Sequence, residues 1–370
     1  MLLPVGSFQH SKMRAAHTKK IWLTIIVAIA LVVLFLVTRF SNSGGDSARA
    51  QLLRFVPADT TSVVFVDLDQ LRNSPFLRTL YAWTPHPVED PDYAQFVTDT
   101  GFNYERDLAQ ILIVFSRHGA TSNTFVLAEG KFDRKKIEAY LSRGSAPTLQ
   151  EKLKVFRFPA NWGGKHVAFA FLSDHRMVIA DSENPAAALS TASRETHAEW
   201  QTRFDRLSGS PLFAVIRQDP TIQTVLAGRS PQLATLIGQL PWITLAGKPD
   251  GDLLRVVAEG ESSSDVMASQ LSDFLQGMQL LAQNGLNDPQ LRQQMNPDER
   301  DAYLELLKGT QIDEIGRGES KSVRVVLPIT SQFLRIAKAP IVGIAPDSGT
   351  DPPRAVGEKK TQQAKPAKRR

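Results

Sequence analysis

Residues 21–38, IWLTIIVAIALVVLFLVT, form an apolar stretch of eighteen residues without a charge. A helix of this length spans about 27 Å, close to the ~30 Å hydrocarbon core of a bilayer. We therefore predict a transmembrane helix over 21–38, which would hold the rest of the chain at a membrane surface.

The charges that flank this segment predict its orientation. Residues 1–20 carry four basic residues and no acid, whereas three arginines occupy the matching distance after residue 38. The positive-inside rule then places residues 1–20 in the cytoplasm and the folded part outside it. In a bacterial cell this corresponds to the periplasmic face of the inner membrane. The alternative is a signal peptide cleaved at Ala48-Arg49-Ala50. The apolar core is longer than the ~7–15 residues of such peptides, which favours an uncleaved, single-pass signal anchor.

The two ends of the chain carry its positive charge. The net charge is +5, but residues 1–20 contribute +4 and residues 345–370 another +4, which leaves −3 for the part between them. A nucleic-acid-binding domain normally carries its basic surface within the fold, so no nucleic-acid partner is expected. The absence of cysteine excludes a disulfide scaffold, a thiolate metal site and a cysteine nucleophile.

Composition shifts divide the chain into segments. After the anchor we expect a linker at 39–53, a first α/β module at 54–197, a second at 205–338 and a disordered basic tail at 339–370. Hydrophobic periodicity predicts the elements within the modules. Strands are expected at 62–68, 110–116, 124–129, 154–158, 166–172, 176–180, 212–217, 242–246, 253–259, 311–316 and 322–327, and helices at 71–81, 93–100, 133–142, 185–192, 220–240, 264–284, 297–307 and 331–338.

The two modules share one similar window. Residues 125–141 align without a gap on residues 255–271, and both windows contain the tripeptide Ala-Glu-Gly, with Glu129 and Glu259 at the same position. Each window combines a strand, a glycine and a polar helix start, as an internal repeat would. We therefore predict an α+β fold in which the transmembrane helix precedes two tandem ferredoxin-like β-α-β-β-α-β modules. Their sheets would be mainly antiparallel, with helices on one face.

Two aspartates are candidates for chemistry, although the sequence predicts no metal site. Asp67 and Asp69 end the first predicted strand, where alternate carboxylates point to one side and could bind a metal ion. The simpler interpretation is that Asp69 caps the following helix and Asp67 merely ends the strand. Glu129 and Glu259 are candidate binding residues by their recurrence, although a structural role at a strand end explains that recurrence better.

Other candidates have structural explanations. The loop HPVEDPD carries His86, Glu89, Asp90 and Asp92, but acidic proline-rich loops are usually solvated turns. No phosphate-binding, dinucleotide-binding or serine-nucleophile motif occurs, and no cofactor is expected. A helical stripe is expected to fill the core; its members are Met267, Leu271, Phe274, Met278 and Leu281.

Four passages carry a resemblance to a known group: FVPADTTSVVFVDLDQLRNSPFL, GFNYERDL, VLAEGKFDRKKIEAYL and VAFAFLSDHRMVIAD. The chain resembles uncharacterised bacterial envelope proteins in which Pro-Ala-Asp-Thr precedes the first strand. The resemblance covers roughly residues 54–195 and implies a single-pass anchored, two-repeat α/β domain of unknown function. It implies no catalytic residues.

The sequence therefore predicts a membrane-anchored extracytoplasmic binding or scaffold protein that contacts the bilayer through residues 21–38 and binds an envelope protein partner. The alternative is a metal-assisted hydrolase that uses Asp67 and Asp69. A third interpretation is a scaffold whose basic tail contacts anionic lipid or wall polymer. The basic residues of that tail include Lys359, Lys360, Lys365, Lys368, Arg369 and Arg370.

Overall fold

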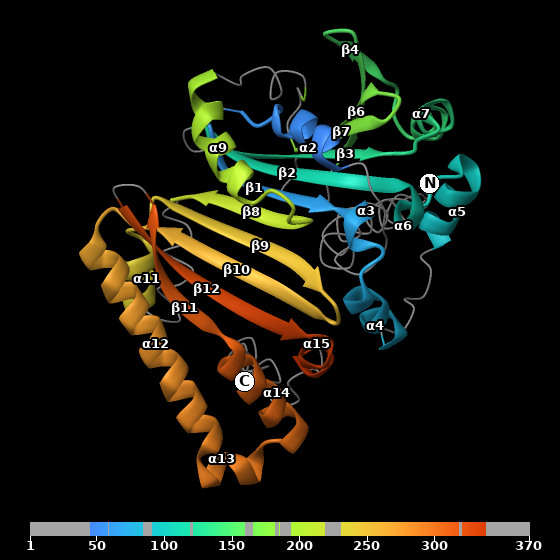
Figure 1. Ribbon diagram of the computed structural model, residues 1–370. Helices are drawn as coiled ribbons and strands as arrows, with labels where there is room; N and C mark the ends of the chain where they lie inside the picture. Colours follow the sequence, from blue (N-terminus) through green and yellow to red (C-terminus); the bar gives the residue numbers. More distant parts are fainter. Residues whose placement is uncertain are drawn as a thin grey trace, which may run out of the picture.

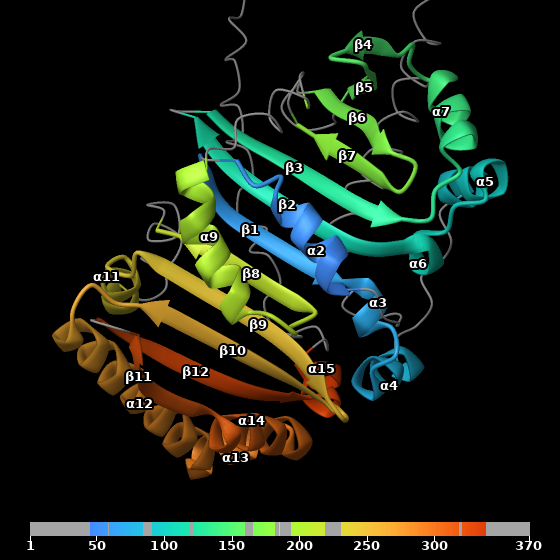
Figure 2. The ribbon, with the colours of Figure 1, turned by 45° about the horizontal axis from the view of Figure 1, so that its top comes forward.

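The first strand of the fold, β1 (Thr60–Asp67), lies at the middle of a wide sheet rather than at the edge of a small one. The computed structural model describes residues 45–57, 59–83, 91–118, 121–159, 166–181, 185, 194–218, 231–317 and 320–337. Within these residues twelve strands form one sheet, in the order β11-β12-β10-β9-β8-β1-β2-β3-β7-β6-β5-β4, shown in Figures 1 and 2. The other strands are β2 (Leu108–His118), β3 (Thr121–Gly130), β4 (Thr148–Gln150), β5 (Leu153–Pro159), β6 (His166–Ser173), β7 (Arg176–Ala180), β8 (Leu212–Arg217), β9 (Trp242–Asp250), β10 (Leu253–Glu261), β11 (Gln311–Arg317) and β12 (Ser320–Thr330).

The predicted pair of ferredoxin-like modules is wrong, because β1 and β8 join the two halves into one sheet. Val63 pairs with Val215 and Phe65 with Phe213 in an antiparallel ladder. All neighbouring strands of the sheet pair antiparallel. A module folded alone would leave the backbone groups of β1 unpaired along one side, whereas the β1–β8 ladder satisfies them.

The strand order is the same in both directions from this central pair. One half reads β1-β2-β3-β7-β6 and the other reads β8-β9-β10-β12-β11, with β5 and β4 added beyond β6. This similarity concerns topology alone, and the internal repeat of the sequence stays a prediction.

Helices cover both faces of the sheet, which corrects the expectation of helices on one face. Helices α2 (Gly45–Leu53) and α9 (Arg194–Arg206) pack on the face formed by Val63, Phe65 and Phe213. The residues of α2 lie within the predicted linker 39–53, so this part of the linker is helical. The opposite face of the sheet is covered by two other sets of helices, one from the first half of the chain and one from the C-terminal half.

Helices of the first half lie near the ends of β1, β2 and β3. They are α3 (Leu68–Leu71), α4 (Pro75–Trp83), α5 (Pro91–Thr100), α6 (Tyr104–Asp107) and α7 (Arg134–Ser142). Leu68, Leu71, Phe76 and Leu77 are buried there against Val66 and Ile111 of the sheet. Because side chains alternate between the two faces of a strand, Val63 and Phe65 of β1 lie in one core and Val66 lies in the other.

The C-terminal helices cover the second face beside β11 and β12. They are α11 (Pro231–Ile237), α12 (Asp265–Asn287), α13 (Pro289–Gln294), α14 (Pro297–Gly309) and α15 (Ser331–Ala337). The hydroxyl of Ser264 accepts a hydrogen bond from the Met267 amide and so caps α12, which buries Ala268 and Leu271. The predicted apolar stripe fills the core only in part, because Met267 and Phe274 are half-buried and Met278 and Leu281 are exposed.

Several sequence predictions lie outside the described residues. They include the anchor at 21–38, the tail at 339–370, most of the HPVEDPD loop and most of the helix expected at 185–192. In the part of the chain that the structure does describe, no helix is both long enough and apolar enough to cross a membrane.

Candidate functional site

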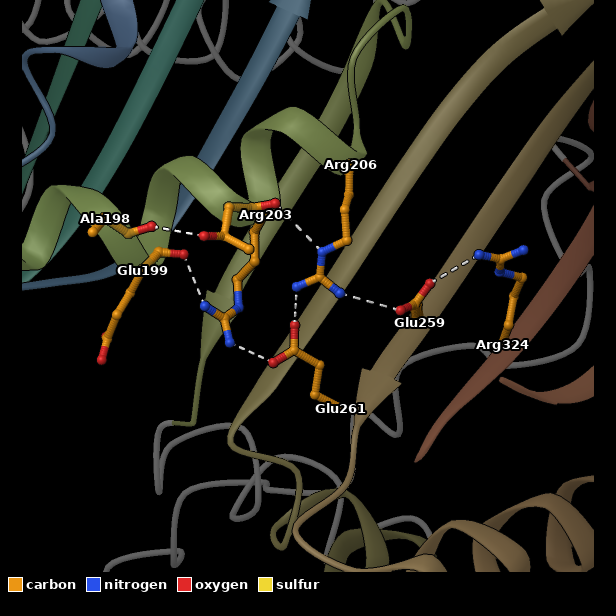
Figure 3. A network of polar contacts seen from close by, with 8 residues as sticks. Ala198, Glu199, Arg203, Arg206, Glu259, Glu261 and Arg324 are labelled. Atoms are coloured by element: carbon orange, nitrogen blue, oxygen red, sulfur yellow. Dashed lines mark hydrogen bonds and ion pairs between the residues drawn. The ribbon is translucent and has the colours of Figure 1, made fainter. Parts of the chain in front are cut away.

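A group of charged side chains, one of them buried and the others partly exposed, lies where α9 crosses the sheet (Figure 3). Trp200 and Phe204 anchor α9, because both are nearly fully buried in the core below the helix. Arg203 and Arg206, three residues apart, therefore come to the same side of α9 and reach toward β10. Their position in the last turn also suits the negative end of the helix dipole.

The carboxylates that meet these arginines come from β10. Glu259 and Glu261 are two residues apart on the strand and so point to the same face. Glu261 accepts hydrogen bonds from both Arg203 and Arg206, one with each carboxylate oxygen. Arg206 also lies 3.4 Å from Oε1 of Glu259 (Nη1 to oxygen).

Arg324 of β12 completes the group from the other side. Its Nη2 lies 3.2 Å from Oε2 of Glu259, so that Glu259 is held between Arg206 and Arg324. Glu259 is only 6% exposed, whereas the side chain of Arg324 is 35% exposed. The group therefore extends from the covered side of α9 toward solvent over β12.

Three guanidinium groups thus face two carboxylates, and the ring of Trp242 stabilises the excess positive charge. The Arg203 guanidinium lies 3.9 Å from the centre of the Trp242 ring, and that of Arg217 lies 5.5 Å from it. A ring face attracts a cation most strongly where water is displaced. We call the set Arg203, Arg206, Glu259, Glu261 and Arg324 the α9 charge cluster.

A smaller arrangement occupies the matching place in the first half. Nη2 of Arg176 on β7 lies 3.0 Å from Oε1 of Glu129 on β3, and it also donates to Gln51 of α2. Glu129 pairs with Arg176 across β3 and β7, as Glu259 pairs with Arg324 across β10 and β12. The recurrent glutamates therefore do not meet. Each lies on the second strand beyond the central pair β1–β8 and binds an arginine.

Helices α2 and α9 also contact one another. Arg49 of α2 donates to the backbone oxygens of Phe204 (2.8 Å) and Leu207 (3.3 Å), and its guanidinium lies 4.6 Å from the centre of the Phe213 ring. These bonds satisfy carbonyl groups at the end of α9 that the helix itself leaves free. Both helices are thereby fixed on the same face of the sheet.

Asp67 and Asp69 lie apart from this cluster, at the end of β1. Asp67 is 1% exposed and accepts hydrogen bonds from the Gln70 amide (2.8 Å) and from Nε2 of Gln110 (2.9 Å). It is therefore Asp67, and not Asp69, that caps the following helix. Asp69 forms an ion pair with Arg72, whose guanidinium also donates to the Leu108 carbonyl.

Burial shifts the protonation equilibria at this end of β1. It raises the pKa of Asp67 above the usual value of 3.8, although the bonds from Gln70 and Gln110 act in the opposite direction. Burial likewise raises the pKa of Asp69, against the attraction of Arg72 and Lys131. Among the described residues, no three histidines or acids are grouped so that they could hold a metal ion.

The raised pKa of Asp67 predicts a pH-dependent contribution to stability. The folded protein keeps this proton to higher pH than the unfolded chain, so the contribution of Asp67 falls as pH rises from about 4 through the folded-state pKa. Asp67→Asn, which retains a capping oxygen, should remove this dependence. Urea unfolding of both proteins at several pH values from about 3.5 to about 7, a range that includes the usual Asp pKa, measures this pH dependence. As pH rises, the free energy of unfolding of the variant should increase relative to that of the native protein. If the two free energies change in parallel with pH, the raised pKa of Asp67 is contradicted.

Most of the α9 charge cluster was not predicted from the sequence. Glu259 was a candidate by its recurrence, whereas Glu261, Arg203, Arg206 and Arg324 were not. The sequence did contain a signal for it: two acids are spaced to share one face of a strand, and two arginines are spaced to share one side of a helix. That signal was hidden because residues 198–204 were assigned to the boundary between modules.

Comparisons with known proteins add distant likenesses only. No known protein family matches the sequence, and no curated protein matches it. Crystal form III of TP0453 aligns with a TM-score of 0.40 and 11% identity over 76% of this chain and 95% of that chain. Crystal form I of TP0453 aligns with a TM-score of 0.40 and 10% identity over 76% and 94% of the two chains.

Proposed function

We propose that the protein is a membrane-anchored extracytoplasmic binding or scaffold protein that acts by contact with a protein partner. The observation that carries this proposal is the number of large apolar side chains that α12 leaves exposed. Six large apolar side chains are exposed among the described residues, and four of them lie on this helix: Val266, Met278, Leu280 and Leu281. Such a concentration on one helix is typical of an interaction surface.

The polar groups support binding rather than chemistry. Asp67 caps a helix and Asp69 pairs with Arg72, while Glu259 and Glu261 hold α9 on the sheet. The groups that the sequence offered for catalysis thus make structural contacts. No observation favours the metal-assisted hydrolase.

The proposed location rests on the sequence and on where the described fold begins. Helix α2 starts at Gly45, and six residues separate it from the end of the apolar segment at Thr38. Six extended residues span about 20 Å, so an anchor at 21–38 would hold α2 close to the bilayer. The basic tail would add attraction to anionic lipid of about 1 kcal/mol per basic residue near the surface. The resemblance to bacterial envelope proteins supports the same location.

Cysteine labelling tests this location, because the native sequence contains no cysteine. Ala146→Cys places a thiol in the exposed loop between α7 and β4, and Ser11→Cys places one before the anchor. In spheroplasts, a membrane-impermeant maleimide should label the first variant at once and the second only after permeabilisation. The reverse pattern would contradict the orientation, and release of the protein from membranes by salt alone would contradict the anchor.

A further inference from the structure

The two faces of the sheet are not equally covered beside the central pair β1–β8. On the face that α9 covers, Phe213, Val215 and Trp242 of β8 and β9 are only 1%, 0% and 7% exposed. The residues that alternate with them point to the opposite face, which we call the second face, and are half-buried apolar side chains. They are Ala214, Ile216, Ile243 and Leu245. Water therefore reaches the second face at strands that exclude it on the first.

Four apolar residues form a continuous row across the second face. Ala214 of β8 pairs with Leu245 of β9. Leu245 also pairs with Ala258 of β10, and Ala258 pairs with Val325 of β12. All four side chains are half-buried, and the row is about 14 Å long, because neighbouring strands lie about 4.8 Å apart. Every strand of this apolar row has a paired strand on both sides, so its exposure arises above the face and not at an edge of the sheet.

The described part of the chain ends beside this row. Helix α15 begins directly after β12, and it contacts α14 and α4. Its Leu334 packs against the same core as Leu212 and Val256, which lie on the second face two residues along their strands from the apolar row. Figures 1 and 2 both show α15 at the end of β12, beside α14. The residues that follow Ala337 therefore start on the second face.

The sequence after α15 matches the row in its chemistry. Residues 339–345 read Ala-Pro-Ile-Val-Gly-Ile-Ala and carry no charge, and a polar sequence that includes Asp347 follows them. Isoleucine and valine favour extended backbone, and Pro340 holds the residue before it outside the helical region. Such a segment does not continue α15. It removes its apolar side chains from water by lying against an apolar surface.

We propose that residues 339–345 lie extended across the apolar row and complete the cover of the second face. Val325 of the row lies five residues before the end of β12, which is about 17 Å along the strand. Seven extended residues span about 24 Å, so the segment is long enough to reach the row. The predicted disordered tail would then begin at residue 346.

The connection to α15 favours this segment over a separate partner. A short connection gives the segment an effective concentration of about the millimolar range at the row, which a separate molecule rarely attains. The contact lies within one chain. The inference therefore goes beyond the proposed function and depends neither on the anchor nor on a protein partner.

Maleimide labelling of the full chain in liposomes tests the proposal, because the native sequence contains no cysteine. Ala258→Cys places a thiol in the apolar row, and Val257→Cys places one on the opposite face of the same strand; both positions are half-buried. The labelling rate of a covered thiol depends on how often its cover opens. Ile341→Asp with Val342→Asp puts charge against the row. The pair should raise the labelling rate at position 258 by about tenfold or more and leave the rate at position 257 unchanged.

The matched control is Ala355→Asp with Val356→Asp, which adds the same two charges beyond the segment and should leave the rate at position 258 unchanged. The thermal midpoint of each variant checks the fold, and Val325→Cys repeats the measurement on the neighbouring strand. A rate at position 258 that the substitutions in the segment do not change would overturn the proposal, as would equal acceleration at positions 257 and 258. If that rate changes instead with the protein-to-lipid ratio, a second copy or lipid covers the row, and the proposal is likewise wrong.

Discussion

Gly130→Ala is expected to destabilise the fold by about 3 kcal/mol or more. Gly130 ends β3 at a point where the backbone of Asp107 and Leu108 lies directly against it. An added Cβ would overlap the carbonyl oxygen of Asp107 and lie 3.1 Å from Cα of Leu108. That carbonyl accepts a hydrogen bond from the Lys131 amide (2.8 Å), and the Gly130 amide donates to the backbone oxygen of His175 (3.0 Å). Relief of the clash therefore requires backbone movement that strains both bonds.

The matched control is Gly260→Ala, at the corresponding place on β10. There the added Cβ would meet Cδ1 of Leu240 at 2.6 Å, which is the end of a side chain and not backbone. Leu240 can rotate away, so we expect a loss nearer 1 kcal/mol, at the low end of the cost of overpacking. Chemical unfolding of both variants, followed by tryptophan fluorescence, gives the two free energies. Equal losses would show that the backbone contact at Gly130 has no special cost.

The local elements could be predicted from the sequence, because each depends on neighbouring residues. The period-two and continuous apolar runs located β1, β8 and β10 to within about two residues, and the Ser264 start located α12. The pairing of β1 with β8 could not be predicted in this way. Both strands are apolar on both faces, and such a strand fits the middle of one wide sheet as well as it fits the middle of a small one.

The candidate site was less predictable than the fold, because its members come from three separate elements. Glu259 was noticed through its similarity to Glu129, but nothing local shows that Arg206 and Arg324 bind it. Helix α9 was missed, although Trp200 and Phe204 are spaced as one buried helical face. Most other residues of α9 have charged or amide side chains, so the two aromatic residues did not stand out as a helical pattern.

Glu261→Gln should have the second large effect, a loss of about 3 kcal/mol in the free energy of unfolding. Glu261 accepts hydrogen bonds from Arg203 and Arg206 and is largely shielded from water, as is Arg203. Glutamine keeps the size of the side chain but removes its charge. Two guanidinium groups would then face an amide, with the Trp242 ring below Arg203 unable to replace the carboxylate. The control is Asp250→Asn, which breaks the exposed pair with Arg255 and should cost less than about 1 kcal/mol.

A second substitution decides whether this loss arises from unpaired charge or from lost packing. If the cost is the buried positive charge, Arg203→Met in the Glu261→Gln protein removes the charge that was left unpaired. Methionine keeps an apolar contact with Trp242, while Arg206 keeps its contact with Glu259. The double variant should then be less destabilised than the sum of the two single variants by about 1 kcal/mol or more. Strict additivity would mean that Glu261 and Arg203 stabilise α9 independently, and the α9 charge cluster would then be a set of separate contacts.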